Sequence, residues 1–286
     1  MRPDLFQIHG FSVPSYGFMV ALGILAATGL SLWLARRDGV ATEFVMDAVF
    51  WGVVAGFLGA RFLYLVVSWQ ATLADPVGAV FSGGGGVIAG GLVAGAAAVA
   101  WTARRHRVSL GRAADLLVPG VALAQALGRV GCHLAGCCFG CVAPAWAALF
   151  SVRYPRLGPA DATAVTGSWP YLDHLRRGLV TTAEAWSLPV VPVQLLEAAW
   201  CGFLALGLTA LWFRRLPAGT VAVVYGVSYA VGRFALEYLR GDEDRGVRWG
   251  LSLSQWLAPI ALAALAWLWS RRIRPRAAHQ PPKASA

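Results

Sequence analysis

One short stretch of this chain, GRVGCHLAGCCFG at residues 128–140, gathers several side chains that can do chemistry. It contains Arg129, His133 and three cysteines, and Cys141 follows directly. A guanidinium binds two phosphate oxygens at once, a histidine exchanges protons near neutral pH, and thiols bind metals or form disulfides. The stretch therefore indicates anion binding, proton transfer or thiol chemistry.

Three arginines, Arg61, Arg129 and Arg233, lie inside or at the end of apolar runs. An arginine at the centre of a bilayer costs about 2.5–3.5 kcal/mol, so such residues usually face a cavity and bind an anion or pair with a carboxylate. Snorkelling to the interface and structural ion pairing are the alternatives. Because each arginine lies beside a polar cluster, we favour a phospholipid headgroup as the bound anion.

Two neighbouring segments carry the carboxylates and amides that could hold these guanidiniums. One helix face of YGVSYAVGRFALEYLR carries Tyr229, Arg233, Glu237 and Arg240, by their spacing. Glu237 can pair with either arginine, and PVQLLE adds Gln194 and Glu197 near the outer end of another apolar run. These side chains are candidates for orienting an arginine cluster.

The composition decides which elements must position these groups. The chain of 286 residues is 58% hydrophobic and only 13% charged, with a mean hydropathy of +0.60, whereas soluble domains carry about 25% charged residues. This predicts an all-α, polytopic membrane protein. The net charge of +10 indicates basic loops rather than nucleic-acid binding, because the arginines cluster between apolar runs.

Seven apolar segments are long enough to cross a bilayer, which takes about 20 residues: 16–35, 45–68, 80–102, 114–134, 190–213, 219–239 and 251–270. We predict one transmembrane domain over residues 1–276. It includes a small extracytoplasmic head at about 140–189, and a disordered cytoplasmic tail follows at 277–286. The arginine-rich loops lie around 36–37, 104–112, 214–215 and 271–276. They predict a bacterial plasma-membrane protein with its N-terminus outside the cell and its C-terminus in the cytoplasm.

The segment FSGGGGVIAGGLVAG at 81–95 is the other unusual run. It lacks the Gly-Lys-Ser/Thr of a phosphate-binding P-loop. Glycine costs about 1 kcal/mol in a helix relative to alanine, so four in a row predict an unwound segment. Such backbone is tolerated at membrane depth where it lines a cavity.

With these motifs in order, the chain resembles the prolipoprotein diacylglyceryl transferase family over roughly residues 8–260. YGFMVALG is similar to the family's first-helix Tyr-Gly motif, and GARFLY to its Gly-x-Arg-x-x-Tyr segment. GRVGCHLAGCCFG aligns with its signature, and VPVQLLE, YGVSYAVGRFALEYLR and SLSQWLAP resemble its later motifs.

The resemblance implies transfer of a diacylglyceryl group from phosphatidylglycerol to the lipobox cysteine thiol of preprolipoproteins, with release of glycerol 1-phosphate. It implies that Arg129 and Arg233 hold the phosphate and that Glu237 orients Arg233. The remaining lipid-binding residues are then Arg240, Arg61, Tyr16, Gln194 and Glu197. The implied partners are phosphatidylglycerol, lipobox signal peptides and membrane lipid, with no nucleic acid and no cofactor, and we expect a monomer.

The chain departs from the family pattern in its acid–base residues. Ala89 stands where the family often has a histidine proposed as the base. His133, unusual within the signature, is our candidate substitute, although a histidine at a helix end can also be merely structural. A non-catalytic binder of phospholipid or lipopeptide is therefore an alternative function.

The cysteines leave several possibilities open. Cys138 and Cys141 form a C-x-x-C pair, which allows a second alternative, a membrane thiol–disulfide oxidoreductase. A zinc or iron–sulfur site is a further possibility, but the gap between Cys132 and Cys137 is unusual. We favour packing for Cys132, Cys137 and Cys201, and we expect no metal.

Overall fold

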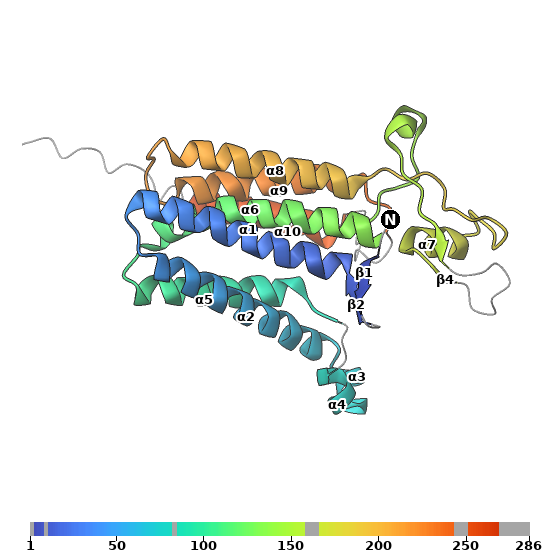
Figure 1. The fold of residues 1–286 in the computed structure, drawn as a ribbon, viewed down its shortest axis with the longest axis horizontal. Helices are drawn as coiled ribbons and strands as arrows, with labels where there is room; N and C mark the ends of the chain where they lie inside the picture. The colour runs from blue at the N-terminus through green and yellow to red at the C-terminus, as the bar shows by residue number, and fades with distance from the viewer. Residues whose placement is uncertain (1–2, 9–10, 82–84, 158–165, 243–250, 269–286) are drawn as a thin grey trace, which may run out of the picture. The chain divides into compact units, whose positions relative to one another are not determined.

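Long helices dominate the computed structural model, which describes residues 3–8, 11–81, 85–157, 166–242 and 251–268 (Figure 1). Each of the seven predicted apolar segments overlaps one long helix. These are α1 (Ser15–Asp38), α2 (Thr42–Val67), α5 (Ile88–Arg105), α6 (Leu110–Ala135), α8 (Val193–Trp212), α9 (Thr220–Glu237) and α10 (Leu253–Leu268). Glycines mark some of the helix ends. Gly136, with φ of 75°, follows the last residue of α6, which is the usual place for a left-handed residue.

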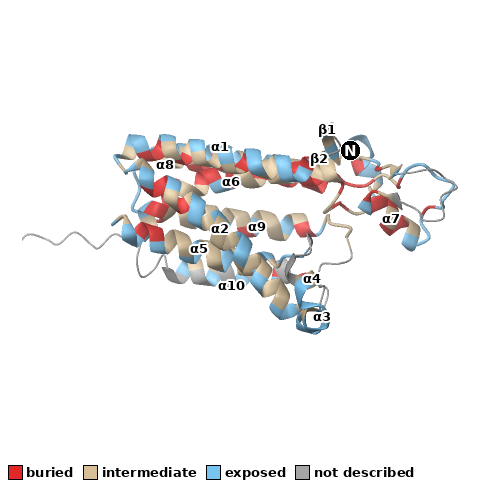
Figure 2. Ribbon diagram, turned by 60° about the horizontal axis from the view of Figure 1, so that its bottom comes forward, coloured by how far each residue is buried: buried red, intermediate tan, exposed pale blue. Residues whose placement is uncertain are grey.

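Four of the described helices, α1, α2, α6 and α8, are long and apolar enough to cross a membrane. Large apolar side chains on these helices point outward, and Phe57 on α2 and Phe203 on α8 are 74% and 70% exposed. The exposed faces run along the helices in Figure 2. Apolar outer faces of this kind are typical of helices that contact lipid. The crossing of α5, α9 and α10 stays a prediction.

Several short elements were not predicted from the sequence. Two antiparallel hairpins pair β1 (Asp4–Ile8) with β2 (Phe11–Pro14) and β3 (Arg156–Leu157) with β4 (Thr166–Gly167). Three short α-helices, α3 (Trp69–Ala74), α4 (Pro76–Phe81) and α7 (Trp169–Arg176), and a 3₁₀ helix at Ala145–Phe150 complete the described elements. The protein is therefore mostly helical rather than purely α.

The contacts within the chain divide it into two compact units. One unit comprises Met1–Ala27 and Val118–Ala286, and the other comprises Thr28–Leu117. Helices α1 and α6 contribute residues to both, because the division falls inside each of them. We refer to these as the large unit and the small unit.

In the small unit, α2 and α5 pack closely through glycines. A Cβ atom at Gly59 would lie 2.6 Å from the carbonyl oxygen of Gly90, so neither position has room for a side chain. Residues 85–87 are not helical, and Gly85 has φ of 89°. The prediction of an unwound glycine segment is confirmed for these residues, whereas residues 82–84 lie outside the described part of the chain.

The core of the large unit forms where α6, α8 and α9 meet. Ala122, Ala205, Leu208 and Val221 are buried together there, and α10 packs on α9. Small residues bring α1 against α6: a Cβ atom at Gly23 would lie 3.1 Å from the carbonyl oxygen of Ala124. This close packing of α1, α6, α8 and α9 fixes the positions of the site side chains that these helices carry.

The segment between α6 and α8 folds as a small head built largely from irregular backbone. Its chain ends are held by bridges that Val190 makes with Val142 and with Val152. Tyr154 and Tyr171 form its interior, with 1% and 0% exposure. The location of this head outside the cell remains a prediction, and the predicted disordered tail at 277–286 lies outside the described residues.

Candidate active site

Helices α6, α8 and α9 bring three of the predicted site residues together. Oε1 of Glu197 lies 3.0 Å from Nη2 of Arg129 and 3.8 Å from Nε of Arg233. The Glu197 side chain is only 3% exposed, whereas Arg129 is 22% and Arg233 is 14% exposed. One buried carboxylate therefore bridges two guanidiniums that retain some access from outside.

A second carboxylate holds Arg233 from its own helix. Glu237, one turn later on α9 and 2% exposed, forms an ion pair with Nη1 of Arg233. Removing one partner of such a buried pair leaves an uncompensated charge and costs about 3–5 kcal/mol. The two glutamates thus fix the Arg233 guanidinium.

Tyr16 reaches the same end of the bundle from α1. A Cβ atom at Gly131 would lie 2.9 Å from Cβ of Met19 and 3.4 Å from Cα of Tyr16, so the glycine allows α1 to approach α6. Tyr16 is 49% exposed and is within electrostatic range of Arg129. Its position agrees with a role at the rim of a lipid site.

The backbone after α6 is tied to the residues after α9. The Cys141 amide donates to the Leu239 carbonyl at 2.8 Å, and the Gly241 amide donates to the Phe139 carbonyl at 3.1 Å. Within this junction Arg240 pairs with Asp242, with 2.9 Å between Nε and Oδ1. Arg240 is therefore oriented by a neighbouring carboxylate that the sequence analysis did not assign to it.

A hydrogen-bonded chain links α8 to His133 through the head. Nε2 of Gln194 donates to the Cys137 carbonyl at 2.9 Å and to the Tyr154 hydroxyl at 3.2 Å. The same hydroxyl lies 3.2 Å from Nδ1 of His133. Burial raises the pKa of Tyr154 to about 12, so the phenol keeps its proton at neutral pH. Gln194 therefore donates to the loop backbone and to Tyr154, and its contact with lipid stays a prediction.

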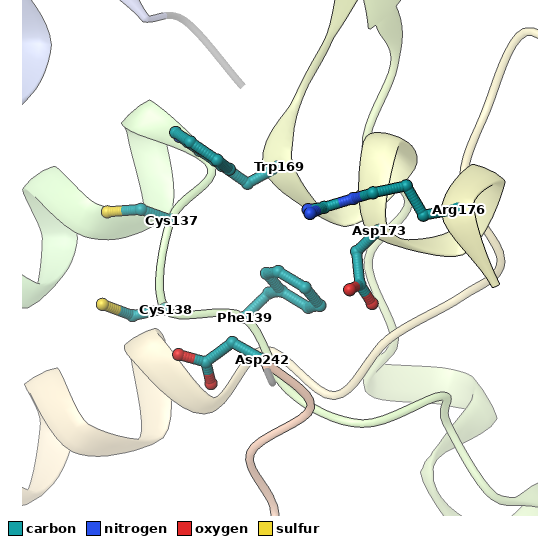
Figure 3. A pocket seen from close by; sticks show the side chains of 7 residues that line it. All are labelled: Cys137, Cys138, Phe139, Trp169, Asp173, Arg176 and Asp242. Carbon is teal, nitrogen blue, oxygen red and sulfur yellow. The ribbon is translucent and has the colours of Figure 1, made fainter. Parts of the chain in front are cut away.

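Three cysteines meet beside this junction. The Sγ atoms of Cys132, Cys137 and Cys138 all lie within 4.8 Å of one another, and the thiols are not joined in disulfides. Figure 3 shows the sulfur atoms of Cys137 and Cys138 pointing in the same direction, away from Phe139. The C-x-x-C spacing suggested Cys141 as the partner of Cys138. In the structure Cys138 instead groups with Cys132 and Cys137, because the chain turns sharply at Gly136 and Cys138.

A cavity of about 240 Å³ opens on the other side of the two adjacent cysteines (Figure 3). It is lined by aromatic and charged side chains of the loop, of α7 and of the segment after α9: Phe139, Trp169, Asp173, Arg176 and Asp242. Its polar and aromatic lining suits a peptide segment better than an acyl chain.

Arg61 belongs to the small unit and is engaged by backbone there. Its guanidinium donates to the Gly85 carbonyl at 2.9 Å and to the Ala79 carbonyl, and it lies over the Tyr64 ring. These bonds satisfy one carbonyl of the unwound glycine segment, that of Gly85, and one carbonyl of α4. Its membership in the lipid site stays a prediction.

Several polar side chains, among them Gln125, Tyr225 and Tyr154, were not predicted from the sequence. Tyr225 donates to Oε1 of Gln125 at 2.8 Å and stacks on Tyr229, with ring centroids 5.8 Å apart. Tyr229 is within electrostatic range of Glu197 and both arginines. Polar residues at mid-span were the available signal for Gln125, whereas Tyr154 lies in the head and had no signal in the sequence.

Comparison with known proteins decides the family. A family model for prolipoprotein diacylglyceryl transferase matches residues 3–271, nearly the whole chain. The chain belongs to this family. Its relatives include phosphatidylglycerol–prolipoprotein diacylglyceryl transferase 2 of Clostridium perfringens, which is 34% identical over 266 residues, 92% of each chain.

Other members of the prolipoprotein diacylglyceryl transferase family match at similar levels. The phosphatidylglycerol–prolipoprotein diacylglyceryl transferase of Clostridium tetani is 32% identical over 90% of this chain and 92% of its own. That of Gloeobacter violaceus is 32% identical over 94% of this chain and 93% of its own. These matches include the helices that carry Arg129, Glu197 and Arg233.

Proposed function

We propose that this protein transfers the diacylglyceryl group of phosphatidylglycerol to the thiol of the lipobox cysteine in preprolipoproteins. The observation that carries this proposal is the arrangement of Arg129 and Arg233 around the buried carboxylate of Glu197. Two partly accessible guanidiniums at the end of an apolar helix bundle suit a phospholipid phosphate. The names of the relatives give the same substrates.

The arginines would act on charge that develops during the reaction. The carbon–oxygen bond between the diacylglyceryl group and the phosphate breaks, and the bonding electron pair leaves with glycerol 1-phosphate. Guanidinium groups aimed at the phosphate stabilise this charge, and loss of one well-placed donor typically costs about 10²–10³-fold in rate. Glu197 and Glu237 keep the guanidiniums oriented, and Arg240 and Tyr16 complete the lipid site in this proposal.

The substrate thiol must lose its proton to become a nucleophile. His133 is our candidate for the acceptor, because Ala89 replaces the histidine expected at the family position. The bond between the Tyr154 hydroxyl and Nδ1 of His133 orients the ring. The cavity beside Cys138 is the proposed contact for residues that flank the lipobox cysteine.

The active site would open at the outer face of the bacterial plasma membrane. All seven long helices cross the membrane in this proposal, with the N-terminus and the head outside and the C-terminus inside. The basic loops that motivate this orientation contain few acidic residues. We propose a single transmembrane domain over 1–276 that acts as a monomer.

The deciding experiment mixes the purified protein in detergent with phosphatidylglycerol and a lipobox peptide that contains one cysteine. The proposal requires a peptide mass gain of one diacylglyceryl group and an equal amount of glycerol phosphate. A matched peptide with serine in place of cysteine should give no product, because its hydroxyl is not deprotonated near neutral pH. Binding of the lipid or the peptide without product would contradict the transferase function and favour the alternative, a non-catalytic binder of phospholipid or lipopeptide.

A further inference from the structure

We propose that Cys132, Cys137 and Cys138 bind a zinc ion, and that the lipobox thiol of the substrate completes its coordination. Zinc in proteins takes four ligands in a tetrahedron, and sites that do chemistry supply three from the protein. In the described part of the chain these three thiols form such a group. The role in thiol activation rests on the transferase function proposed above, whereas zinc binding itself does not.

The distances between the sulfur atoms suit this metal. A tetrahedral site with zinc–sulfur bonds of about 2.3 Å has its sulfur atoms about 3.8 Å apart. The three Sγ atoms already lie within 4.8 Å of one another, so rotamer adjustments of about 1 Å close the site. Thiolates are among the ligands that zinc prefers.

The backbone holds the adjacent Cys137 and Cys138 in an unusual conformation that lets both side chains reach one metal ion. Neighbouring side chains on extended backbone point to opposite sides. Cys138 instead has φ of 52°, a left-handed conformation that costs a non-glycine residue about 1–2 kcal/mol. The result is that the sulfur atoms of Cys137 and Cys138 point the same way (Figure 3). Both lie within 4.8 Å of the sulfur atom of Cys132, near the end of α6. Strain of this kind is often retained at functional sites.

The surroundings hold the site in place and balance its charge. Gln194 binds the Cys137 carbonyl, and the Cys141 amide binds the Leu239 carbonyl, so the loop is fixed on both sides of Cys138. Zinc with four thiolates carries two negative charges. Arg240 and Arg129 both lie within electrostatic range of Cys138 and offset this charge.

The zinc site would activate the substrate thiol, the role proposed for the family histidine that Ala89 replaces in this chain. A thiol that binds zinc loses its proton, which passes to His133 or to water. The zinc-bound thiolate attacks the diacylglyceryl carbon, a sulfur–carbon bond forms, and the carbon–oxygen bond to the phosphate breaks. Glycerol 1-phosphate leaves with that electron pair, and the neutral thioether, a weaker ligand, dissociates from zinc. Arg129, within electrostatic range of Cys138, links the thiol site to the phosphate site.

The first test measures zinc on the full-length protein in detergent with a phosphine reductant. We expect one zinc per chain, and replacement of Cys132, Cys137 or Cys138 by serine should weaken binding by more than the roughly 100-fold that loss of an outer-shell partner causes. Cys141→Ser is the matched control, because this cysteine lies in the same loop but outside the cluster. Helix content measured for each variant separates ligand loss from misfolding.

Several results would overturn the zinc site. These are copper or an iron–sulfur cluster in place of zinc, equal zinc binding by the cluster variants, or no zinc bound by the folded wild-type protein. None of these readouts depends on activity, so they leave the transferase function itself standing.

The second test asks whether the substrate thiol binds the metal. Cobalt(II) would replace zinc, and a lipobox peptide should change the sulfur-to-cobalt absorption when it contains cysteine but not serine. Removal of the metal should abolish transfer, and zinc should restore it. An unchanged cobalt spectrum, or full transfer by metal-free protein, contradicts thiol activation even if the protein is a transferase. A spectral change without any transfer would support thiol binding and contradict the proposed function.

Discussion

The carboxylate of Glu197 on α8 lies 3.0 Å from the guanidinium of Arg129 on α6, and its own side chain is almost fully buried. The pair joins two helices within the last two turns of α6, before the cysteine-containing loop. Because the carboxylate occupies one side of the guanidinium, the remaining donors of Arg129 have a fixed direction. In the function proposed above, these donors contact the phosphate of the lipid.

Replacing Arg129 by lysine should abolish most transfer while the charge is kept. An ammonium can still pair with Glu197, but it cannot bind two phosphate oxygens in a planar fork. We expect a fall of about 10²–10³-fold in turnover, as for loss of one donor to a developing anion. The measurement is product formation by mass spectrometry, with expression level and helix content as controls. Turnover near the wild-type rate would rule out the phosphate role of Arg129.

Replacing His133 by alanine tests how the substrate thiol is activated. Loss of a general base that the reaction requires costs about 10²–10⁴-fold. If zinc activates the thiol, the proton can pass to water and the fall should be smaller, about tenfold or less, with the largest loss at low pH. Transfer rates measured against pH distinguish the two cases, and Tyr154→Phe, which removes the bond to Nδ1, serves as the comparison. A loss of 10³-fold or more would assign proton removal to His133 rather than to a metal.

Replacing Gly140 by alanine should disrupt the junction between the cysteine-containing loop and the segments that contain Val191 and Leu239. The added Cβ atom would lie 2.2 Å from the Val191 carbonyl oxygen and 3.0 Å from that of Leu239. Since neither backbone can move without breaking its own hydrogen bonds, we expect loss of folded protein or of activity. Gly202→Ala is the control: nothing lies within 4 Å of its added atom, and helical alanine is favoured by about 1 kcal/mol. Equal thermal stability of the two variants would show that the junction tolerates a side chain.

The head should lose stability as the pH falls below about 6.5. Burial lowers the pKa of His174 below its ordinary value, and its Nδ1 accepts a hydrogen bond from the Leu188 amide at 3.2 Å. Because the folded-state pKa lies below that of the unfolded state, the stabilisation is complete above the unfolded pKa. It is lost as the pH falls from there toward the folded pKa. Asp173 raises and Arg177 lowers this pKa, but burial is the larger cause.

Hydrogen exchange of the Leu188 amide at two pH values measures this effect, after correction for the intrinsic exchange rate. His174→Asn can still accept the bond but does not titrate, so its protection should be independent of pH in this range. The same pH dependence in the wild-type protein and in this variant would assign the effect to another group.

The orientation of the chain is tested by reporter fusions. The arginine-rich loops predict a cytoplasmic C-terminus, so a reporter that is active only in the cytoplasm should work when fused after residue 276. The same reporter fused near residue 160 should be silent. The reverse result would put the head in the cytoplasm and the proposed active site on the inner face.

The sequence by itself determined the class of the protein and the chemical identity of its site. Long apolar runs predict helices, because an α-helix satisfies its backbone hydrogen bonds in lipid within a single segment. Arg129, Glu197 and Arg233 could be singled out because a charge in an apolar run is costly. Helical spacing allowed Glu237 to pair with Arg233 or with Arg240, and the structure contains the pair with Arg233.

The tertiary structure alone decided which of these groups meet. Glu197 is 68 residues from Arg129 in the chain, and no local periodicity could choose it over Glu237 as the bridge between arginines. Tyr154 reaches His133 through the irregular fold of the head, where backbone follows turns rather than a period. The cysteines show the same limit, because spacing suggested Cys138 with Cys141, whereas left-handed turns at Gly136 and Cys138 group Cys138 with Cys132 and Cys137. The backbone that follows these turns packs closely at Gly140 and Gly241 against segments distant in the chain, and the sequence does not display such contacts.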